Sequence, residues 1–501
     1  MTPKFDINSQ DLIDIVSDTV QKDSPIYLVG GAIRNLLLGK EIKDLDFVVK
    51  GNVRSVLNRV KRKMNAQAFM LDDERQTGRI IYQSPGGEKT LLDFVSMAEQ
   101  DILKDLLDRD FTINAMMLNI KDLSLLIDPL NGEKDLRNSL LCCCSPDSME
   151  LDPLRVLRGI RLSLYYNLEI EPNSFQQMEK VSPRLITVSA ERIRDELFKI
   201  FQSPDPEKGI RLLDDLGCIQ NTLPELEKLK KVQACPPHVH GLWEHTLRVM
   251  HYLNEITHGF VYEGKGASKI TDVSTKIVDG LAPYSKSFRE LISRGYPEGR
   301  TRVGLLLFSA LYHDAGKPES LSEGDDGRLH FYGHAEKSKE RISTRAKALA
   351  LSNPEVNYLS NVVKNHMRIH DLVMAKDSFT DRAIHRFFRD TGELGLDICL
   401  LSLADMLATY EITVSNDQLM NELDVISQLL NAWWRKKDSV VEPPRLLSGD
   451  DLQDIFGLNP GPLFREILET LHEAHAVNEI VTREEAINFV RSFLVNRESL
   501  N

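Results

Sequence analysis

The chain has 501 residues, of which 42% are hydrophobic and 27% are charged, so it is long enough for several domains with cores of their own. The net charge of -13 argues against indiscriminate binding of nucleic acid, although residues 54–63, 155–161 and 183–194 are locally basic. No stretch reaches the roughly 18 uncharged apolar residues that a membrane-spanning helix needs.

The N-terminal residues and the cysteines point to a reducing compartment. MTPKFDINSQDLIDIV carries acids where a signal peptide would have a basic end and an apolar run. Three of the six cysteines, Cys142, Cys143 and Cys144, are adjacent, and no C-x-x-C pair occurs. Because this is not the pattern of a disulfide framework, we expect a cytoplasmic protein with no membrane partner.

Strand-like runs alternate with helical segments in the first 140 residues, and turn signals such as SPGGEK separate them. The strand-like runs are residues 26–29, 45–49, 79–82, 90–95 and 116–120. After residue 150 the apolar residues recur at helical spacing. These patterns predict a multidomain, mostly helical chain: an α/β head (1–140), an all-α neck and body (141–234), a helical domain (235–410) and a helical C-terminal region (411–501).

The segment YLVGGAIRNLLLGKEIKDLDFVV, residues 27–49, places two aspartates in an apolar strand. Asp44 and Asp46 are two residues apart, so their side chains project from the same face of the strand. Two carboxylates this close repel each other unless a cation lies between them. Mg²⁺ binds carboxylates together with substrate phosphate oxygens, so the pair is typical of a phosphoryl-transfer site. Two solvated acids at a strand edge are the alternative interpretation.

Nearby residues favour phosphoryl transfer over a solvated edge. Gly30 and Gly31 permit backbone N–H groups to approach a triphosphate closely, just before a helix N-terminus. Arg34 lies on that helix, and Asp93 adds a third acid within the apolar strand TLLDFV. A strand that only displayed acids to solvent would not need this surrounding set.

At this point the segment LVGGAIRNLLLGKEIKDLDFVV resembles the signature of the superfamily of tRNA nucleotidyltransferases and bacterial poly(A) polymerases, which includes the CCA-adding enzymes. Four further segments resemble the later motifs of this superfamily in the same order: RDFTINAMML (109–118), DPLNGEKDLR (128–137), LDPLRVLRGIRL (151–162) and SAERIRDELFKI (189–200). The resemblance implies a nucleotidyltransferase head that adds C or A from CTP and ATP to the 3′ end of tRNA without a nucleic-acid template.

The resemblance also gives the acids their roles. Asp44 and Asp46 would hold two Mg²⁺ ions, one at the 3′-hydroxyl of the RNA and one at the triphosphate. Asp93 would be the third, supporting catalytic carboxylate. In-line attack on the α-phosphorus would then release pyrophosphate.

A nucleotide-binding set follows from the same resemblance: Gly30, Gly31, Arg34, Arg109, Asp110, Asn114, Asp152, Arg155 and Arg158. Within this set, Arg109, Asp110 and Asn114 would contact the ribose, whereas Asp152 and Arg155 would read the base. A carboxylate accepts a hydrogen bond from the exocyclic amine of C or A, and a guanidinium donates to the neighbouring ring acceptor. U and G present a different donor pattern on that edge.

The sequence departs from the superfamily around its second motif. Asp108-Arg109 stands where a double arginine is usual, and only FVSMAEQDILKDLLD separates Asp93 from Arg109. Relatives that complete CCA have a longer mobile loop there, which helps one pocket change from C to A. AEQDILKDLLD instead predicts a helix with little slack. Relatives that add only the two cytidines share this short form, and a separate A-adding enzyme completes the tail. We therefore expect CC addition, with full CCA addition and poly(A) synthesis as open alternatives.

A second set of candidate ligands lies in the helical domain. His245 occurs in HGLWEHTLRVMHYL, His313 and Asp314 end the apolar segment LLLFSALYHDAGKP, and Asp405 occurs in LLSLADMLA. Imidazoles with carboxylates suit a transition metal or a Mg²⁺-bridged pair. A buried histidine that serves only the core is the alternative for any one of them.

This pattern resembles the HD phosphohydrolase domain, which a set of nucleotidyltransferases carries at this position, and it covers roughly residues 235–410. His334 and His366 are further candidate ligands of the HD site, whereas His251, His330 and His370 are expected to lie outside it. Such a domain hydrolyses phosphoesters or mainly supports RNA binding. A rival hypothesis of another class is an HD phosphohydrolase whose N-terminal region only binds RNA.

Overall fold

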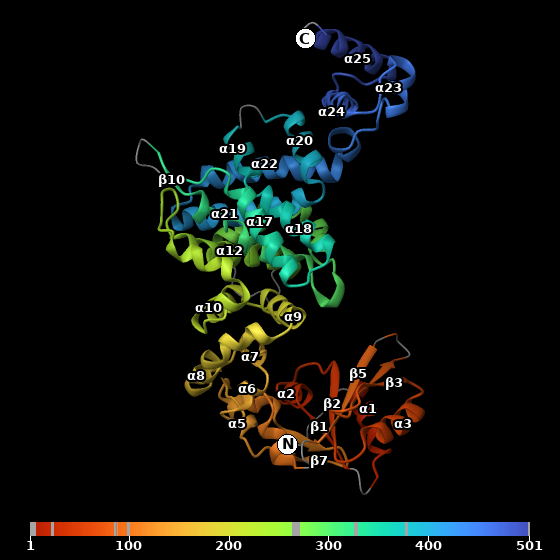
Figure 1. The fold of residues 1–501 in the computed structure, drawn as a ribbon, viewed down its shortest axis with the longest axis vertical. Helices are drawn as coiled ribbons and strands as arrows, with labels where there is room; N and C mark the ends of the chain where they lie inside the picture. Colours follow the sequence, from red (N-terminus) through yellow and green to blue (C-terminus); the bar gives the residue numbers. More distant parts are fainter. Residues whose placement is uncertain are drawn as a thin grey trace. The chain divides into compact units, whose positions relative to one another are not determined.

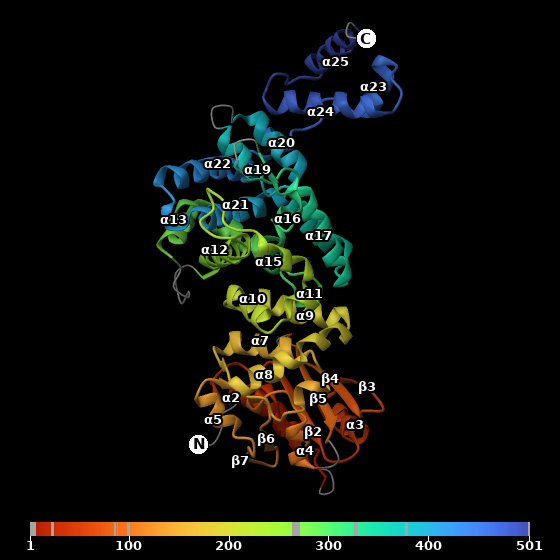
Figure 2. The same cartoon turned by 60° about the vertical axis from the view of Figure 1, so that its left-hand side comes forward.

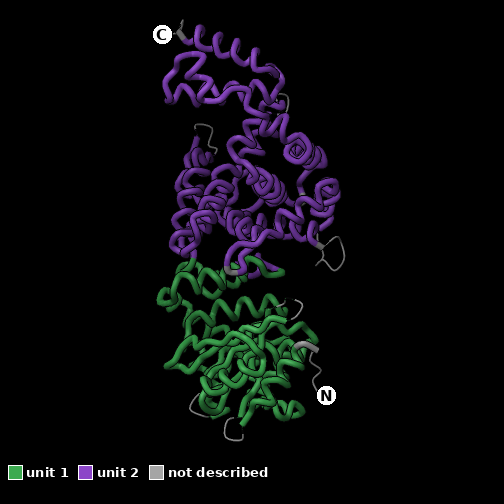
Figure 3. The backbone as a smooth tube through the Cα atoms, turned by 90° about the vertical axis from the view of Figure 1, so that its right-hand side faces the viewer, with its two compact units in different colours: residues 1–204, 211–222 green, residues 205–210, 223–501 purple. Residues whose placement is uncertain are grey.

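The computed structural model describes residues 7–21, 25–84, 87, 89–97, 101–262, 271–324, 329–375 and 379–498. The chain divides into two compact units, one of residues 1–204 and 211–222 and the other of residues 205–210 and 223–501 (Figure 3). None of the helices in these ranges is long and apolar enough to cross a membrane.

The first unit combines a mixed β-sheet with helices (Figure 1). Its elements are α1 (Ile7–Ser17), β1 (Ile26–Val29), α2 (Gly31–Leu37), β2 (Asp44–Val49), α3 (Val53–Met64), β3 (Gln67–Asp72), β4 (Thr77–Gln83), β5 (Lys89–Ser96), α4 (Ile102–Leu107), β6 (Met117–Asn119), β7 (Asp122–Ile127), α5 (Gly132–Arg137), β8 (Leu140–Leu141), α6 (Ser148–Leu151), α7 (Arg155–Tyr166), β9 (Glu169–Ile170), α8 (Pro172–Val181), α9 (Ala190–Phe201) and α11 (Ile219–Thr222), while α10 (Pro206–Asp215) contributes to both units.

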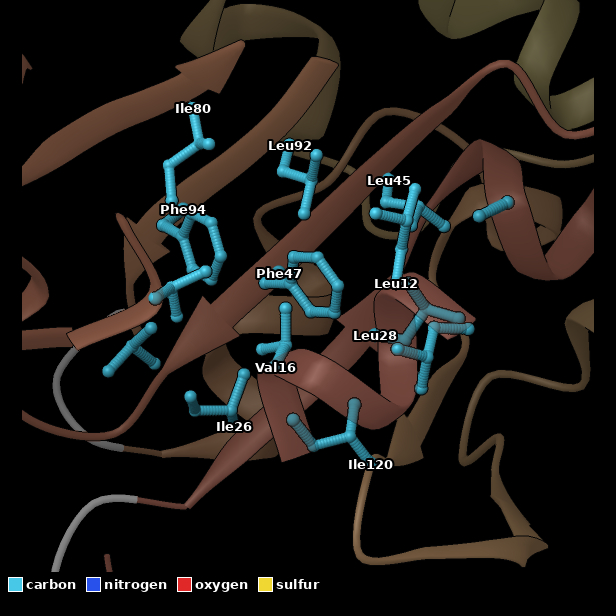
Figure 4. Close-up of a cluster of buried hydrophobic side chains, with 14 of the residues drawn as sticks. Leu12, Val16, Ile26, Leu28, Leu45, Phe47, Ile80, Leu92, Phe94 and Ile120 are labelled. Carbon is cyan, nitrogen blue, oxygen red and sulfur yellow. The ribbon is translucent and has the colours of Figure 1, made fainter. Parts of the chain in front are cut away.

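The large sheet has the strand order β3-β4-β5-β2-β1-β6-β7. β2 and β5 run parallel, and the other neighbouring strands run antiparallel. One face of the sheet carries the larger core, where Phe47 and Phe94 pack with side chains of α1 and α3 (Figure 4). Because side chains alternate along a strand, the residues between these core positions face the other side.

The predicted mixed head followed by helical domains is confirmed, and each predicted strand corresponds to one of β1, β2, β4, β5 and β6. The sequence analysis did not identify β3 and β7, at the two ends of the sheet. QAFMLD in β3 has four consecutive apolar residues on both faces, so it gives no alternating signal, and Phe69 and Leu71 remain exposed. The four-domain division itself stays a prediction.

The second unit is helical apart from one short hairpin (Figure 2). Its elements are α12 (Leu242–Tyr262), α13 (Asp272–Gly280), α14 (Ser285–Ile292), α15 (Arg302–Tyr312), α16 (Lys317–Ser320), β10 (Ser322–Glu323), β11 (Leu329–His330), α17 (His334–Ala348), α18 (Asn353–Lys364), α19 (Arg368–Met374), α20 (Asp381–Thr391), α21 (Leu394–Tyr410), α22 (Asn416–Arg435), α23 (Gly449–Phe456), α24 (Pro462–Ala476) and α25 (Arg483–Glu498).

Buried ion pairs fix the start of α15 within this helical unit. Arg302 donates to both carboxylate oxygens of Asp397 on α21, and the Tyr358 hydroxyl donates to the same carboxylate at 3.0 Å. Arg300 donates to Glu355 on α18 at 2.6 Å. Removing one partner of such a pair leaves an uncompensated buried charge, so these contacts hold α15, α18 and α21 in one arrangement. The end of α15 is where His313 and Asp314 lie.

Candidate active site and metal centre

The parallel pairing of β2 with β5 brings the three predicted catalytic acids of the head together. Asp46 lies opposite Asp93 in the register, and Phe47 lies opposite Phe94. The two phenylalanine rings stack at 4.9 Å on the core face, so both aspartates project from the opposite face. Asp44 shares that face two residues earlier and is exposed. The site therefore opens away from the main hydrophobic core.

The electrostatics of this cluster favour a cation. Burial, together with repulsion from Asp93 and Asp44, raises the pKa of Asp46 to about 6. A neutral carboxyl binds metal poorly, and a divalent cation among three acids would restore the ionised form. The carboxylate oxygens of Asp44 and Asp46 are the ligand type that Mg²⁺ prefers.

Gly30 is required where β1 meets α2. Its φ of 73° lies in the left-handed region, and a Cβ there would be 3.3 Å from Oδ2 of Asp46 and 3.7 Å from Nη1 of Arg109. Val29, at the end of β1, is paired with Asp46 in the register. The glycine therefore keeps the space beside Asp46 clear.

Arg79 is a site residue that the sequence analysis missed. Its Nε and Nη2 donate to the two oxygens of Asp93 at 2.7 and 2.8 Å. Arg79 on β4 lies opposite Asp93 in the antiparallel register. The available signal was its position between Gly78 and Ile80, since Ile80 belongs to the core and Arg79 must face the acids. Asp93 is thus held by a bidentate ion pair, whereas Asp46 is not.

Two of the three predicted ribose-binding residues, Asp110 and Asn114, belong to one hydrogen-bond network, and Arg109 lies apart from it. The buried Asp110 accepts from the Asn114 side chain at 3.1 Å and from Nε of Arg158 at 3.1 Å. Arg34 donates to Asn114 and, at 2.5 Å, to the hydroxyl of Tyr166 on α7. Both oxygens of Asp110 are therefore used within the protein, and Asp110 orients its neighbours. Arg109 donates to Asp105 at 3.1 Å and points toward Gly30.

The two predicted base-reading residues lie at the start of α7. Asp152 precedes that helix, and its Oδ2 accepts from Nη2 of Arg192 on α9 at 2.6 Å. Nη1 of Arg155 donates to the Ser148 carbonyl at 2.7 Å. Each side chain is held by a separate contact and is partly exposed. Arg192 lies in the motif SAERIRDELFKI, but nothing in the sequence marked it as a partner of Asp152.

The remaining motifs make contacts that hold neighbouring elements of the first unit together. In DPLNGEKDLR, Asp128 accepts from the backbone N–H groups of Gly132 and Glu133 at the start of α5. A Cβ at Gly132 would lie 2.1 Å from the Thr112 carbonyl oxygen, so only glycine fits between α5 and the RDFTINAM segment. Arg161 on α7 pairs with Glu196 on α9 at 2.7 Å.

The second unit gathers the predicted HD ligands around one carboxylate. Oδ2 of Asp314 lies 3.2 Å from Nε2 of His313 and 3.8 Å from Nε2 of His245. Oδ1 of Asp314 lies 3.3 Å from Nε2 of His334 and 3.7 Å from Nε2 of His366. Asp314 therefore belongs to two groups of three ligands, each with its ligand atoms within 4.8 Å of one another.

Asp405 on α21 completes the cluster. Its Oδ1 lies 3.0 Å from Nε2 of His245 and 3.6 Å from Nε2 of His313. Nδ1 of His313 is engaged by the Ala310 carbonyl at 2.7 Å, and His334 and His366 make the same kind of contact with carbonyls. This leaves each Nε2 as the acceptor atom, the arrangement usual for metal-ligating histidines.

Beyond the ion-pair contacts within the cluster and that of Lys317 with Asp314, the described ranges give no hydrogen-bond partner to several of its buried atoms: both ring nitrogens of His245, Nε2 of His313, both carboxylate oxygens of Asp314 and Oδ1 of Asp405. Burial lowers the pKa of His313, but Asp314 and Asp405 outweigh it and raise that pKa to about 10, so the ring without a cation is protonated and a bound cation would displace the proton from Nε2. Unpaired buried acceptors are costly, and metal ions would satisfy them at once. The residues therefore fit one or two divalent cations.

Two further side chains at this centre were missed by the sequence analysis. Nζ of Lys317 lies 2.6 Å from Oδ2 of Asp314. The ring of His238 packs edge-on against His245 at 4.6 Å, and burial lowers the pKa of His238 to about 4. The only sequence signal for these two residues was their position close to predicted ligands, His238 near His245 in HVHGLWEH and Lys317 near Asp314 in HDAGK. Neither His251, His330 nor His370 belongs to the two ligand groups found among the described residues.

Family models match successive parts of the chain, and two of them cover the parts that carry these two residue clusters. Residues 26–142 match the family model of the poly A polymerase head domain, residues 167–230 match a probable RNA and SrmB-binding site of polymerase A, and residues 242–410 match the HD domain. A solved structure of a CCA-adding enzyme with ATP superposes with a TM-score of 0.62 at 20% identity, covering 97% of this chain and 95% of that one.

Relatives extend the match over nearly the whole chain. The A-adding tRNA nucleotidyltransferase of Deinococcus radiodurans is 31% identical over 93% of this chain and 94% of its own length. The CC-adding tRNA nucleotidyltransferase of Thermus thermophilus is 27% identical over 95% of this chain and 97% of its own length. The chain therefore belongs to the tRNA nucleotidyltransferase family, as a member with a poly(A) polymerase-type head and an HD domain.

Proposed function

We propose that the head transfers cytidine from CTP, without a nucleic-acid template, to the 3′ end of tRNA, and that it stops after two additions. The observation that carries the proposal is the cluster of Asp44, Asp46 and Asp93 on the face of β2 and β5 away from the core. A module that only bound RNA would gain nothing from crowding these acids together. We place the protein in the cytoplasm, in keeping with the cysteine pattern.

Asp44 and Asp46 would hold Mg²⁺, with Asp93 kept in place by Arg79. Bound Mg²⁺ supplies Lewis-acid activation of the RNA 3′-hydroxyl and neutralises the triphosphate. Arg109 and Arg158 add positive charge beside the acids, and each opposes the raised pKa of Asp46. Gly30 leaves room for the nucleotide next to Asp46. The chain thus provides positioning and charge, as phosphoryl transfer demands.

Asp152 and Arg155 would select the base. Asp152 accepts from the exocyclic amine of cytosine, and Arg155 donates to the adjacent ring acceptors. Arg192 holds one oxygen of Asp152, which keeps the carboxylate plane fixed before the base arrives. Asn114, oriented by Asp110 and Arg34, is placed to contact the ribose.

The limit to two cytidines rests on the segment between Asp93 and Arg109. The described parts of this segment are residues 94–97 and residues 101–108. The second part forms the short helix α4 (Ile102–Leu107), which Asp101 caps and in which Asp105 accepts hydrogen bonds from Arg109. Residues 98–100 of the predicted helix lie outside the described residues. A pocket must be reshaped to accept a purine after a pyrimidine, and a helix fixed at Arg109 has little freedom for this.

Addition of the terminal A alone is a second candidate, because the relative at 31% identity is named an A-adding enzyme. The separate enzyme acting on the same tRNA would then add the two cytidines. Full CCA addition and poly(A) synthesis are further outcomes of the same experiment.

The HD centre supports another candidate function, hydrolysis of a phosphoester by bound metal. The crowding of buried ligand atoms of His245, His313 and Asp314 within 4.8 Å of one another favours it over a purely structural domain. Bound metal ions would activate water and the phosphate oxygens. Lys317 beside Asp314 supplies a positive charge for the phosphate.

The product is tested with tRNA transcripts that end at the discriminator base, at C or at CC, each incubated with one labelled nucleoside triphosphate. We expect CTP incorporation on the first two transcripts and slow ATP incorporation on the third, because α4, held at Arg109, has little freedom to reshape the site for a purine. Rapid ATP addition to the CC transcript alone would establish the A-adding candidate. Long A tails would indicate poly(A) synthesis, and no incorporation would remove the nucleotidyltransferase proposal.

Replacing Asp46 by asparagine should lower kcat by about a thousandfold or more, since metal ions at such sites supply several kcal/mol and about 1.4 kcal/mol is tenfold. Steady-state rates over a Mg²⁺ titration measure this, and tRNA affinity should be retained. Asp11→Asn, at an exposed position of α1, is the matched control. A wild-type rate for Asp46→Asn would be incompatible with its role as a metal ligand.

The preference for CTP over UTP should fall when the side chain of Asp152 or Arg155 is shortened to alanine. Asp152→Ala and Arg155→Ala are each expected to reduce the preference for CTP over UTP by about 5- to 150-fold, the equivalent of 1–3 kcal/mol for a bidentate contact. The ratio of kcat/KM for the two nucleotides is measured, with Asp147→Ala on the exposed N-cap of α6 as control. If both variants keep the wild-type ratio, the base is read elsewhere.

The two sites should act independently. His313→Ala removes a ligand next to Asp314, so bound metal and any phosphoesterase activity should be lost while nucleotide addition continues at the wild-type rate. Metal content by mass spectrometry, hydrolysis of a generic phosphodiester and CTP incorporation are the three measurements. His370→Ala, exposed on α19, is the control. Loss of nucleotide addition in a folded His313→Ala protein would contradict the two-site model.

A further inference from the structure

A small pocket lies in the second unit beside α24, and none of its lining residues belongs to the metal centre. It is formed where α20 and α24 pack together with residues 444–447 (Figure 2). Its volume is about 170 Å³, and leucines of α24 and of residues 446–447 form its apolar walls. Sites for drug-sized ligands measure about 300–1,000 Å³, so this one suits a single ring system.

His385 of α20 lines the pocket with an unused acceptor. Its side chain is 1% exposed, and its Nδ1–H donates to the Val440 carbonyl at 3.0 Å. Burial lowers the pKa of His385, so the ring is neutral and Nε2 carries a lone pair. Nε2 has no hydrogen-bond partner in the part of the chain that the structure describes. A buried acceptor of this kind calls for a donor from a ligand.

Two histidines of α24, like His385, each have one ring nitrogen bonded to a backbone carbonyl oxygen. Nε2 of His472 contacts the Pro443 carbonyl at 2.7 Å, and Nδ1 of His475 contacts the Pro444 carbonyl at 3.0 Å. Because these nitrogens donate to carbonyls, the neutral form of each ring has its other nitrogen as an acceptor. The rings of His385 and His472 are 5.0 Å apart, centroid to centroid. A group with two N–H bonds could donate to both.

Positive charge lies at the rim of the same pocket. Arg445 lines it and is exposed, and no ion pair or hydrogen bond of its side chain is found among the described residues. Arg389 also lines it and is engaged by Asp390 at 2.9 Å and by Glu473 at 3.8 Å, and Glu469 of α24 adds one acidic side chain to the lining, which leaves Arg445 as the cation open to a ligand. Guanidinium groups at the mouth of an apolar pocket favour a ligand that carries a phosphate next to a flat ring.

We propose that this pocket binds a nucleotide whose base carries an exocyclic amino group. The base lies between the leucines, its amino group donates to His385 and His472, and its phosphate meets Arg445. Imidazole faces also provide a stacking surface for a base. The nucleotide is either a free mononucleotide or an unpaired nucleotide of an RNA. The proposal does not depend on the reaction proposed for the head.

Two variants test the pocket in the full-length protein. Leu468→Trp fills it, and Arg445→Glu reverses the rim charge at an exposed position that should not affect folding. Arg465→Glu, exposed on the same α24 but outside the pocket, controls for net charge. Titrations with AMP, CMP and UMP are made by calorimetry, and tRNA lacking CCA is titrated by fluorescence anisotropy, both without catalysis. Head binding is measured separately as KM for CTP, which neither variant should change.

We expect both variants to weaken binding by about tenfold or more, the effect of losing one stacked and bonded base, while Arg465→Glu has a smaller effect. Loss of AMP and CMP binding identifies a free nucleotide, whereas loss of tRNA affinity alone identifies a nucleotide of the RNA. Equal binding of UMP and AMP would overturn the amino-group assignment. Unchanged affinities in both variants, or a stoichiometric zinc ion lost on His472→Ala, would overturn the proposal itself.

Discussion

The head depends on one register, the parallel pairing of β2 with β5. It stacks Phe47 on Phe94 within the core and sets Asp46 beside Asp93 on the other face. Because strand side chains alternate with a period of two, a slip by one residue would bury an aspartate in the core and expose a phenylalanine. Packing and chemistry are therefore specified together, since the same register that is best for the core assembles the acids. Gly30 and Arg79 then act on this arrangement from the neighbouring strands.

Charged side chains are concentrated in both sites, but the two clusters differ in their burial and in the cations that surround them. In the head, the acids are partly exposed and lie among arginines, with Arg79 on Asp93 and Arg109 near Asp46. In the HD centre, Asp314 and His313 are almost fully buried, and their polar atoms contact mainly each other, the neighbouring candidate ligands and Lys317. Crowding charged groups in a buried place costs free energy, so a cation bound at the HD centre would add more to the stability of the fold than a cation bound in the head.

The alternation in DLDFVV and the apolar run before His313 were enough to predict that Asp44 and Asp46 share one face and that His313 follows a buried helix, because local periodicity decides which face a side chain takes. Residues that act through a distant partner gave no such signal. Nothing in the sequence distinguishes Arg79 and Arg192 from other charged residues. Only the folded sheet and neck place them in contact with Asp93 and Asp152. The strand β3 was missed because its apolar run has no period. His334 and His366 were predicted as candidate ligands, but only the structure shows that they share Asp314 with His313 and His245.

The division of the chain has a consequence for its synthesis. The first unit includes residues 211–222, whereas residues 205–210 belong to the second. A nascent chain that had emerged only as far as residue 204 would hold all the head residues discussed above but lack the last piece of its own unit. Domains tend to fold in order as the ribosome releases them, so the first unit completes its packing only after α11 has left the exit tunnel. A truncated protein that ends at residue 204 should consequently be a less stable species than one that ends at residue 222.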